Sequence, residues 1–332
     1  MSSTPITAAV GSYPKAPHEG RPSRLARAIE AFESGEIDQD QLRRVQDDLV
    51  EEVVAEQVRA GLDLVTDGQV RWTDPQEPFA LQLRGFSTSA DDPAPWFGTG
   101  ADFRRPHVVG KVGWGGPVTI GGWRFASSIA DAPVKQVICG PYSLVKLSRN
   151  EHYASERDLV LDVARVLNQE AFELEAAGCT YIQFDEPAIA CHPRFADAPR
   201  SFDLLAEAAD ILTNGIAVTT EIRTSFGSLP EPPEDVFALP FRVFGLDFVD
   251  GQENWDLAKH FPGGGRMLAA GLIDGRNPEL ESEEALAGDI RRLLEFVPAD
   301  RLQVTPSCGL GKLPRDRAEA KLVRLVRAAR SV

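Results

Sequence analysis

The chain has 332 residues, of which 43% are hydrophobic and 26% are charged, as in an ordinary globular protein. Its 35 basic and 50 acidic residues give a formal net charge of −15, which disfavours nucleic acids and anionic membrane surfaces as partners. No apolar run reaches the roughly 20 residues of a membrane span, and we expect no secretory signal. Four cysteines are too few for a disulfide framework, so we expect a cytoplasmic protein.

Eight short apolar runs punctuate the chain, and most are nearly continuous in valine, isoleucine, leucine and alanine. This pattern is typical of strands that are covered on both faces. The runs occupy residues 6–10, 62–66, 134–139, 181–184, 217–222, 243–249, 267–273 and 302–305.

Amphipathic stretches alternate with these runs and predict helices. They occupy residues 41–59, 159–177, 202–213, 255–260, 284–296 and 315–329. Strands that alternate with helices indicate parallel pairing, and eight such strands predict an α/β fold of the (β/α)8 TIM-barrel type. A doubly wound open sheet is the alternative.

One region does not follow the alternation and is expected to be an insertion around residues 85–130. It contains a segment rich in proline and glycine at 91–116, with apolar stretches at 108–114 and 118–123. We interpret it as an inserted hairpin or irregular excursion within a single domain that spans residues 1–332.

The residues that follow each apolar run are the candidates for function, because parallel α/β folds place their sites at the carboxyl ends of strands. Asp185-Glu186-Pro187 is the most specific of these segments. A buried carboxylate there suits an ammonium ligand or proton transfer, whereas the structural alternative is a helix cap and a turn.

The cysteines are considered one by one. Cys308 opens the last helical segment, where a helix N-terminus favours the thiolate that ligates zinc; the alternative is a small buried apolar residue. Cys139 and Cys179 are interpreted as core residues. The adjacent Cys191 and His192 match no common zinc spacing and are expected in a surface loop.

Several segments, in order, carry a resemblance to a known family. They are VGSYP at 10–14, GLDLVTDGQVRW at 61–72, CGPYSL at 139–144, IQFDEPAIA at 182–190, LDFVDGQEN at 246–254 and PSCGLGKLPR at 306–315. Over roughly residues 5–330 the chain resembles the catalytic domain of cobalamin-independent methionine synthase, in its short single-domain form.

The resemblance implies a (β/α)8 barrel that transfers a methyl group to the thiol of homocysteine or a similar small thiol, activated by zinc. It implies that Asp185, next to Glu186, receives the amino group of homocysteine. It further implies that Gly11 and Ser12 hold the carboxylate, while Gln69 takes the place of a second acid of the longer enzymes.

The metal positions depart from the family pattern. The family ligands are a His-x-Cys pair, a glutamate and a cysteine; only Cys308 matches, while Glu221, Arg223 and Asp247 occupy the other positions. A guanidinium does not ligate metals, so we expect Glu221 and Asp247 to neutralise Arg223 and zinc to bind weakly or not at all. Cys191 and His192 are the weaker candidates for replacement ligands.

Three functions therefore compete at this point. The first is a homocysteine S-methyltransferase with an altered or absent metal, and the second is a zinc-free transferase or lyase that acts on another small amino-acid-like or anionic substrate. The third is a non-catalytic binding protein. The methyl donor is open between a methylfolate and a methyl-corrinoid, and a methyl-carrier protein is a candidate partner.

Overall fold

The structure is a computed structural model that describes residues 4–16, 23–89, 91–97, 102–196, 198–231 and 233–332. It divides into two compact units. Unit 1 consists of Met1–Arg71, Gly122–Lys135 and Ala269–Val332, and unit 2 consists of Trp72–Gly121 and Gln136–Leu268.

Parallel strands form the centre of unit 1. β1 (Ile6–Thr7) pairs with β12 (Leu302–Pro306), and β11 (Met267–Ile273), whose first two residues belong to unit 2, is the other neighbour of β12. The run predicted at 62–66 is reduced to two parallel bridges, Ala8 with Leu64 and Val65 with Val134.

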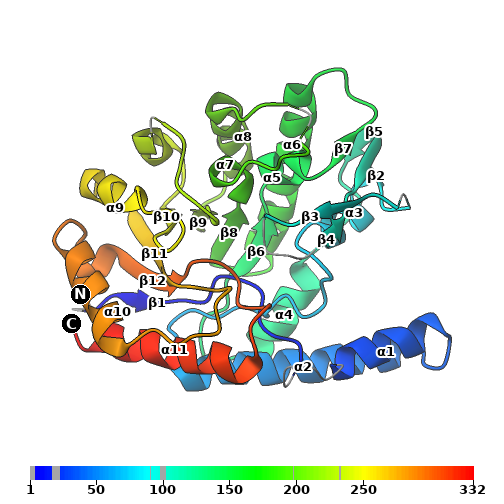
Figure 1. Ribbon diagram of the computed structural model, residues 1–332. Helices are drawn as coiled ribbons and strands as arrows, with labels where there is room; N and C mark the ends of the chain where they lie inside the picture. Colours follow the sequence, from blue (N-terminus) through cyan, green and yellow to red (C-terminus); the bar gives the residue numbers. More distant parts are fainter. Residues whose placement is uncertain (1–3, 17–22, 90, 98–101, 197, 232) are drawn as a thin grey trace. The chain divides into compact units, whose positions relative to one another are not determined.

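Helices surround these strands. They are α1 (Arg24–Glu33), α2 (Gln39–Ala60), α4 (Ile120–Ile129), α10 (Glu283–Leu294) and α11 (Arg315–Arg330), with a 3-10 helix at Ala299–Arg301. Asp38 and Gln41 close a capping box at the start of α2. α11 runs beside α2 (Figure 1), and Arg315 forms ion pairs with Glu52 and Glu56.

Unit 2 contains parallel strands in the order β10-β9-β8-β6. The strands are β6 (Gln136–Cys139), β8 (Tyr181–Asp185), β9 (Thr219–Arg223) and β10 (Val243–Asp247). Nearly all their residues are buried, which confirms the strands predicted from continuous apolar runs.

The helices of unit 2 include the three predicted at 159–177, 202–213 and 255–260. They are α3 (Glu77–Gln82), α5 (Pro141–Lys146), α6 (Glu156–Ala176), α7 (Pro187–Ala190), α8 (Phe202–Thr213) and α9 (Asn254–Leu257), with 3-10 helices at Pro233–Ala238 and Ala258–His260. α5 was not predicted, because six residues that begin with proline carry no helical periodicity.

The predicted excursion is only partly a hairpin. β2 (Arg84–Ser87) pairs antiparallel with β5 (His107–Gly113), which also pairs with β7 (Arg149–Asn150). A second antiparallel pair joins β3 (Pro93–Pro95) to β4 (Asp102–Arg104). The interpretation of 118–123 as hairpin is wrong: this stretch enters α4, where the Trp123 indole N–H donates to the Val134 carbonyl at 3.1 Å.

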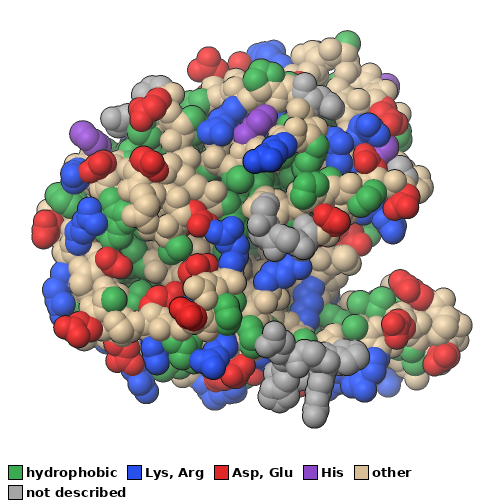
Figure 2. Space-filling model, viewed as in Figure 1, with side chains coloured by type: hydrophobic (Ala, Val, Ile, Leu, Met, Phe, Trp, Pro, Cys, Tyr) green, Lys and Arg blue, Asp and Glu red, His purple; other side chains and the backbone are tan. Residues whose placement is uncertain are grey.

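Surface charges are mixed. On the face in Figure 2, acidic and basic side chains lie interspersed among neutral ones. Within the described ranges, no helix combines the length and apolar character needed to cross a bilayer.

Candidate functional site

Three neighbouring strands of unit 2 each end in a predicted site residue: β8 in Asp185, β9 in Arg223 and β10 in Asp247. In the parallel register, Asp185 is the partner of Arg223, and Arg223 is the partner of Gly245. Residues in register on parallel strands share a face, so Asp185 and Arg223 are neighbours at the carboxyl edge of this sheet.

Arg223 and Glu221 form a buried ion pair, as their spacing on one strand predicted. Glu221 Oε1 accepts from Arg223 Nε at 2.9 Å and lies 2.7 Å from Nη2, and its Oε2 accepts from the Tyr181 hydroxyl at 2.8 Å. The two charged side chains are 1% and 0% exposed. Both carboxylate oxygens of Glu221 are therefore engaged by protein donors.

Asp247 makes different contacts from those predicted. Its oxygens accept from the backbone N–H groups of Phe226 (2.8 Å), Val249 (2.8 Å) and Asp250 (3.0 Å). Burial raises the pKa of Asp247, and these amide donors oppose that rise. The expectation that Asp247 neutralises Arg223 is corrected: it anchors the turn after β10.

Asp185 is half-buried, and its Oδ1 accepts from the Gln183 side-chain amide at 2.6 Å. Gln183 lies two residues earlier on the same face of the strand, and its hydrogen bond restricts the orientation of the Asp185 carboxylate. The arrangement leaves a carboxylate of restricted orientation at the strand end, which is suited to an ammonium ligand.

Glu186 turns away from that edge and binds the start of α5. Its oxygens accept from the backbone N–H groups of Tyr142 at 3.0 Å and Ser143 at 2.7 Å, and the residue is 1% exposed. Burial, and to a lesser degree the Asp185 charge, raise the pKa of Glu186 to about 7 although these hydrogen bonds lower it. Glu186 thus fixes the start of α5 next to Asp185, and a contact with substrate stays a prediction.

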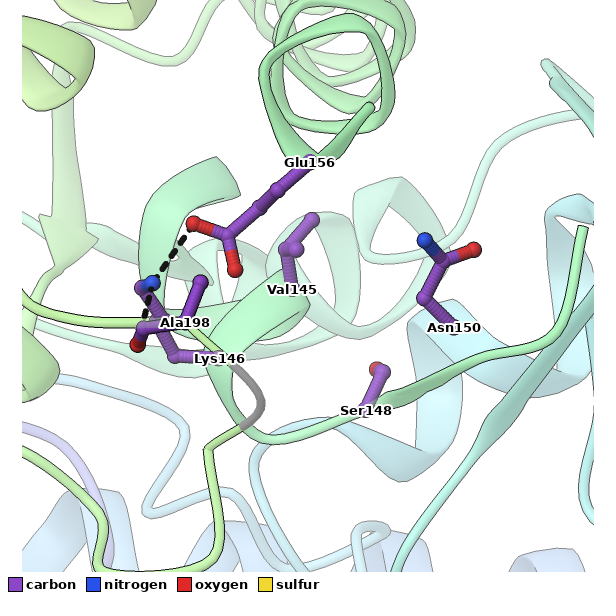
Figure 3. A pocket seen from close by; sticks show the side chains of 6 residues that line it. All are labelled: Val145, Lys146, Ser148, Asn150, Glu156 and Ala198. Carbon is purple, nitrogen blue, oxygen red and sulfur yellow. Dashed lines mark hydrogen bonds and ion pairs between the residues drawn. The ribbon is translucent and has the colours of Figure 1, made fainter. Parts of the chain in front are cut away.

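The other end of α5 borders a cavity of about 310 Å³. Figure 3 shows Lys146 pointing toward Glu156, with Ala198 beside it. The Lys146 ammonium donates to Glu156 at 2.6 Å and to the carbonyls of Ala198 and Pro199, each at 3.0 Å. With its donors so engaged, Lys146 fastens the segment that follows α7 to α5.

An aromatic contact in unit 2 was missed by the sequence analysis. The rings of Phe97 and Phe226 stack with centroids 5.3 Å apart, and both residues have positive φ, at 39° and 68°. Such conformations are costly for aromatic residues and concentrate at functional sites. No sequence signal marks them, since both positions lack the usual glycine or asparagine.

In unit 1, Ser12 lies in a glycine cradle. A side chain at Gly309 would overlap the Ser12 hydroxyl, and one at Gly311 would come within 2.9 Å of it. The Leu310 N–H also donates to the Ser12 carbonyl at 2.8 Å. The loop after β1, which contains Gly11 and Ser12, is thus seated against the loop that follows Cys308.

Gln69 faces this same loop. Gly68 and Gln69 have φ of 67° and 50°, and the Gln69 amide nitrogen would lie 3.3 Å from a side chain at Gly11. The Gln69 N–H donates to Asp67 Oδ1 at 2.9 Å, and burial raises the pKa of that carboxyl. Unit 1 therefore brings together three predicted substrate-binding residues, Gly11, Ser12 and Gln69.

Cys308 is 5% exposed, and its sulfur would lie 2.7 Å from a side chain at Gly275. Cys139 and Cys179 are core thiols, as predicted; burial raises the pKa of Cys179 to about 11. Cys191 and His192 are half-buried in the loop after α7.

The residues at the expected zinc positions do not fit a zinc ion. Glu221 is held by Arg223 and Tyr181, Asp247 by three backbone amides, and Arg223 brings a permanent positive charge. Among the residues that the structure describes, no group of three or more histidine, cysteine, aspartate or glutamate side chains is placed to hold a metal ion.

A glycine substitution tests the strained loop of unit 1. Gly68→Ala is expected to lower the free energy of unfolding by about 2–4 kcal/mol. The new methyl group would lie 2.5 Å from Val53 Cγ1, and the alanine backbone would have to adopt a left-handed φ. Gly35→Ala is the matched control, with φ of 76° and nothing within 4 Å. It should lose only about 1 kcal/mol in urea unfolding; equal losses would contradict the crowding argument.

The raised pKa of Glu186 predicts a pH dependence of stability. Its folded pKa of about 7 exceeds the ordinary value of 4.5, so the folded state holds the proton more tightly. Unfolding free energy should therefore fall by about 2–3 kcal/mol as pH rises from about 4.5 to 7. Glu186→Gln should abolish this slope in denaturant titrations, while Glu284→Gln, at an exposed site on α10, should preserve it.

Comparisons with known proteins show the family to which this chain is similar. The model of the family described as "Cobalamin-independent synthase, Catalytic domain" matches residues 5–331. A methionine synthase of Saccharolobus solfataricus is 32% identical over 342 aligned residues, covering 100% of this chain and 96% of that protein. A methionine synthase of Sulfolobus acidocaldarius is 33% identical and covers 97% of this chain and 90% of that protein.

Solved structures show the same fold. A B12-independent methionine synthase from Shewanella sp. W3-18-1, in complex with selenomethionine, superposes with a TM-score of 0.83 at 23% identity, covering 99% of this chain and 97% of that one. A putative vitamin-B12-independent methionine synthase from Listeria monocytogenes gives 0.77 at 22% identity, covering 100% and 99%. The chain belongs to the cobalamin-independent methionine synthase family.

Proposed function

We propose that this protein is a methyltransferase that moves a methyl group to the thiol of homocysteine. The observation that carries the proposal is the match to the family's catalytic domain over residues 5–331, with methionine synthases as relatives along the full chain. In this reaction the acceptor sulfur loses its proton to solvent, attacks the methyl carbon and forms a C–S bond, while the bond from methyl to donor breaks.

Residue roles follow from the family positions and the local geometry. Asp185, oriented by Gln183, receives the ammonium group of the acceptor. Gly11 and Ser12 bind its carboxylate, and the strained Gln69 presents a neutral amide beside them. The donor is a methylfolate or a methyl-corrinoid, and a methyl-carrier protein is needed only in the second case.

We also infer that one (β/α)8 barrel domain spans residues 1–332. The bridges Ala8–Leu64 and Val65–Val134 support an eighth strand position at residues 64–65. We further propose that the protein is cytoplasmic, because four cysteines are too few for a disulfide framework. A crystal structure with an open sheet would contradict the barrel.

The second candidate is a zinc-free transferase or lyase that acts on another small anionic substrate. The Glu221–Arg223 pair favours it, because it replaces the family's ligand pair by an ion pair. A non-catalytic binding protein is the third candidate. Transfer of a labelled methyl group to homocysteine would exclude the second and the third candidate.

A substitution at Asp185 tests the acceptor site. Asp185→Asn is expected to weaken homocysteine binding by roughly 2–4 kcal/mol, since a charge-assisted hydrogen bond to the ammonium group is lost, with little effect on folding. Isothermal titration calorimetry measures the change, with Asp316→Asn at an exposed site on α11 as control. Unchanged affinity would show that Asp185 has only a structural role.

Metal content tests the cofactor. We expect the purified protein to hold well under one zinc per chain by mass spectrometry, because the ligand positions carry an arginine and fully engaged carboxylates. One zinc per chain that disappears in Cys308→Ser would contradict this and restore the family's metal with unusual ligands.

A further inference from the structure

The Glu221–Arg223 pair is oriented along its strand. Arg223 is the last residue of β9, and Glu221 lies two residues earlier on the same face, so the positive group is nearer the carboxyl edge of the sheet. Asp185, the proposed ammonium ligand, is in register with Arg223 on the adjacent strand. Strand spacing in a sheet is about 4.8 Å, which sets the scale of their separation.

Gly245 provides the room for the guanidinium. It is the register partner of Arg223 on β10, and a side chain there would overlap Arg223 Nε and lie 2.7 Å from both Arg223 Cζ and Glu221 Oε1. The guanidinium thus occupies the space that a β10 side chain would fill. Any residue larger than glycine at 245 would displace it.

The hydrogen bonds fix the group in place. Nε and Nη2 of Arg223 both lie against Glu221 Oε1, and the Tyr181 hydroxyl holds the other oxygen. A guanidinium keeps its proton at any physiological pH. The pair is buried, and in an environment of low dielectric constant a fixed charge acts on nearby groups more strongly than it would in water.

We propose that Arg223 supplies the positive charge that stabilises the acceptor's thiolate in place of a metal ion, and that Gly245 is the residue that admits it. The inference rests on the proposed methyl transfer to homocysteine. A nearby cation lowers the pKa of a thiol, so the bound acceptor loses its proton to solvent and its sulfur becomes the nucleophile. The acceptor class is a small amino acid with an ionisable thiol.

The test compares homocysteine with methionine, which has the same amino-acid group but no ionisable thiol. Calorimetric dissociation constants are measured in chelator, from about pH 6 to 9, for the wild type, Glu221→Gln/Arg223→Met and Gly245→Ala. The double variant removes both charges and leaves no carboxylate orphaned. Arg242→Met, at an exposed position before β10, is the matched control.

For the wild type and Arg242→Met, homocysteine affinity should rise with pH while methionine affinity stays level. In the double variant and in Gly245→Ala, homocysteine should bind about tenfold or more weakly above neutral pH and without pH dependence, with methionine unchanged. If the variants lose affinity for homocysteine and methionine equally, or if the ratio of the two affinities is unchanged, the role of Arg223 is overturned but the proposed function is not. The same holds if homocysteine binding requires stoichiometric zinc. A wild type that binds neither ligand would overturn the proposed function as well.

Discussion

An arginine that is 1% exposed must keep its charge and must therefore keep a counter-charge, and this requirement organises the strand ends of unit 2. Glu221 supplies the counter-charge, and the Tyr181 hydroxyl donates a hydrogen bond to its second carboxylate oxygen. The backbone around the pair is tied to it as well: the Arg223 carbonyl accepts from the Glu186 N–H at 2.7 Å, and the Gly245 carbonyl accepts from the Thr224 N–H at 2.8 Å. Loss of one partner alone would leave a buried charge without compensation.

The same constraint bears on whether these strand ends can bind zinc. A tetrahedral zinc site needs thiolate, imidazole or carboxylate groups with lone pairs available. Here the β9 positions carry opposite charges that satisfy each other, and the β10 carboxylate caps a turn. Family membership thus sets the fold and the reaction class, while the residues at the strand ends decide how the nucleophile is prepared.

Unit 1 contributes preorganisation of a different kind. Gly68 and Gln69 hold left-handed backbone conformations, and glycines at 309 and 311 let the Ser12 hydroxyl approach the backbone closely. A binding loop held by strain and close packing has little freedom to lose when a ligand arrives.

Much of this architecture was predictable, and the exceptions have physical causes. Continuous apolar runs located the buried strands, and α1 also carries apolar residues at helical spacing behind its Ser23 cap, so that signal was present but was not used. The Glu221–Arg223 contact followed from two-residue spacing on a strand. The hydrogen-bond partners of Asp247 did not follow from the sequence, because nearby backbone N–H groups compete with the Arg223 guanidinium for its carboxylate. The strained Phe97 and Phe226 depend on tertiary packing that no local pattern records.

We propose that this chain methylates homocysteine without a resident metal. The most direct measurement is a single-turnover reaction of metal-depleted protein with homocysteine and a donor, methylfolate or methyl-corrinoid, that carries a ¹³C-labelled methyl group. Mass spectrometry would follow labelled methionine, and metal content would be measured on the same sample. We expect labelled methionine to form at a rate that added zinc does not raise. Methionine formation that appears only with one zinc per chain would contradict it.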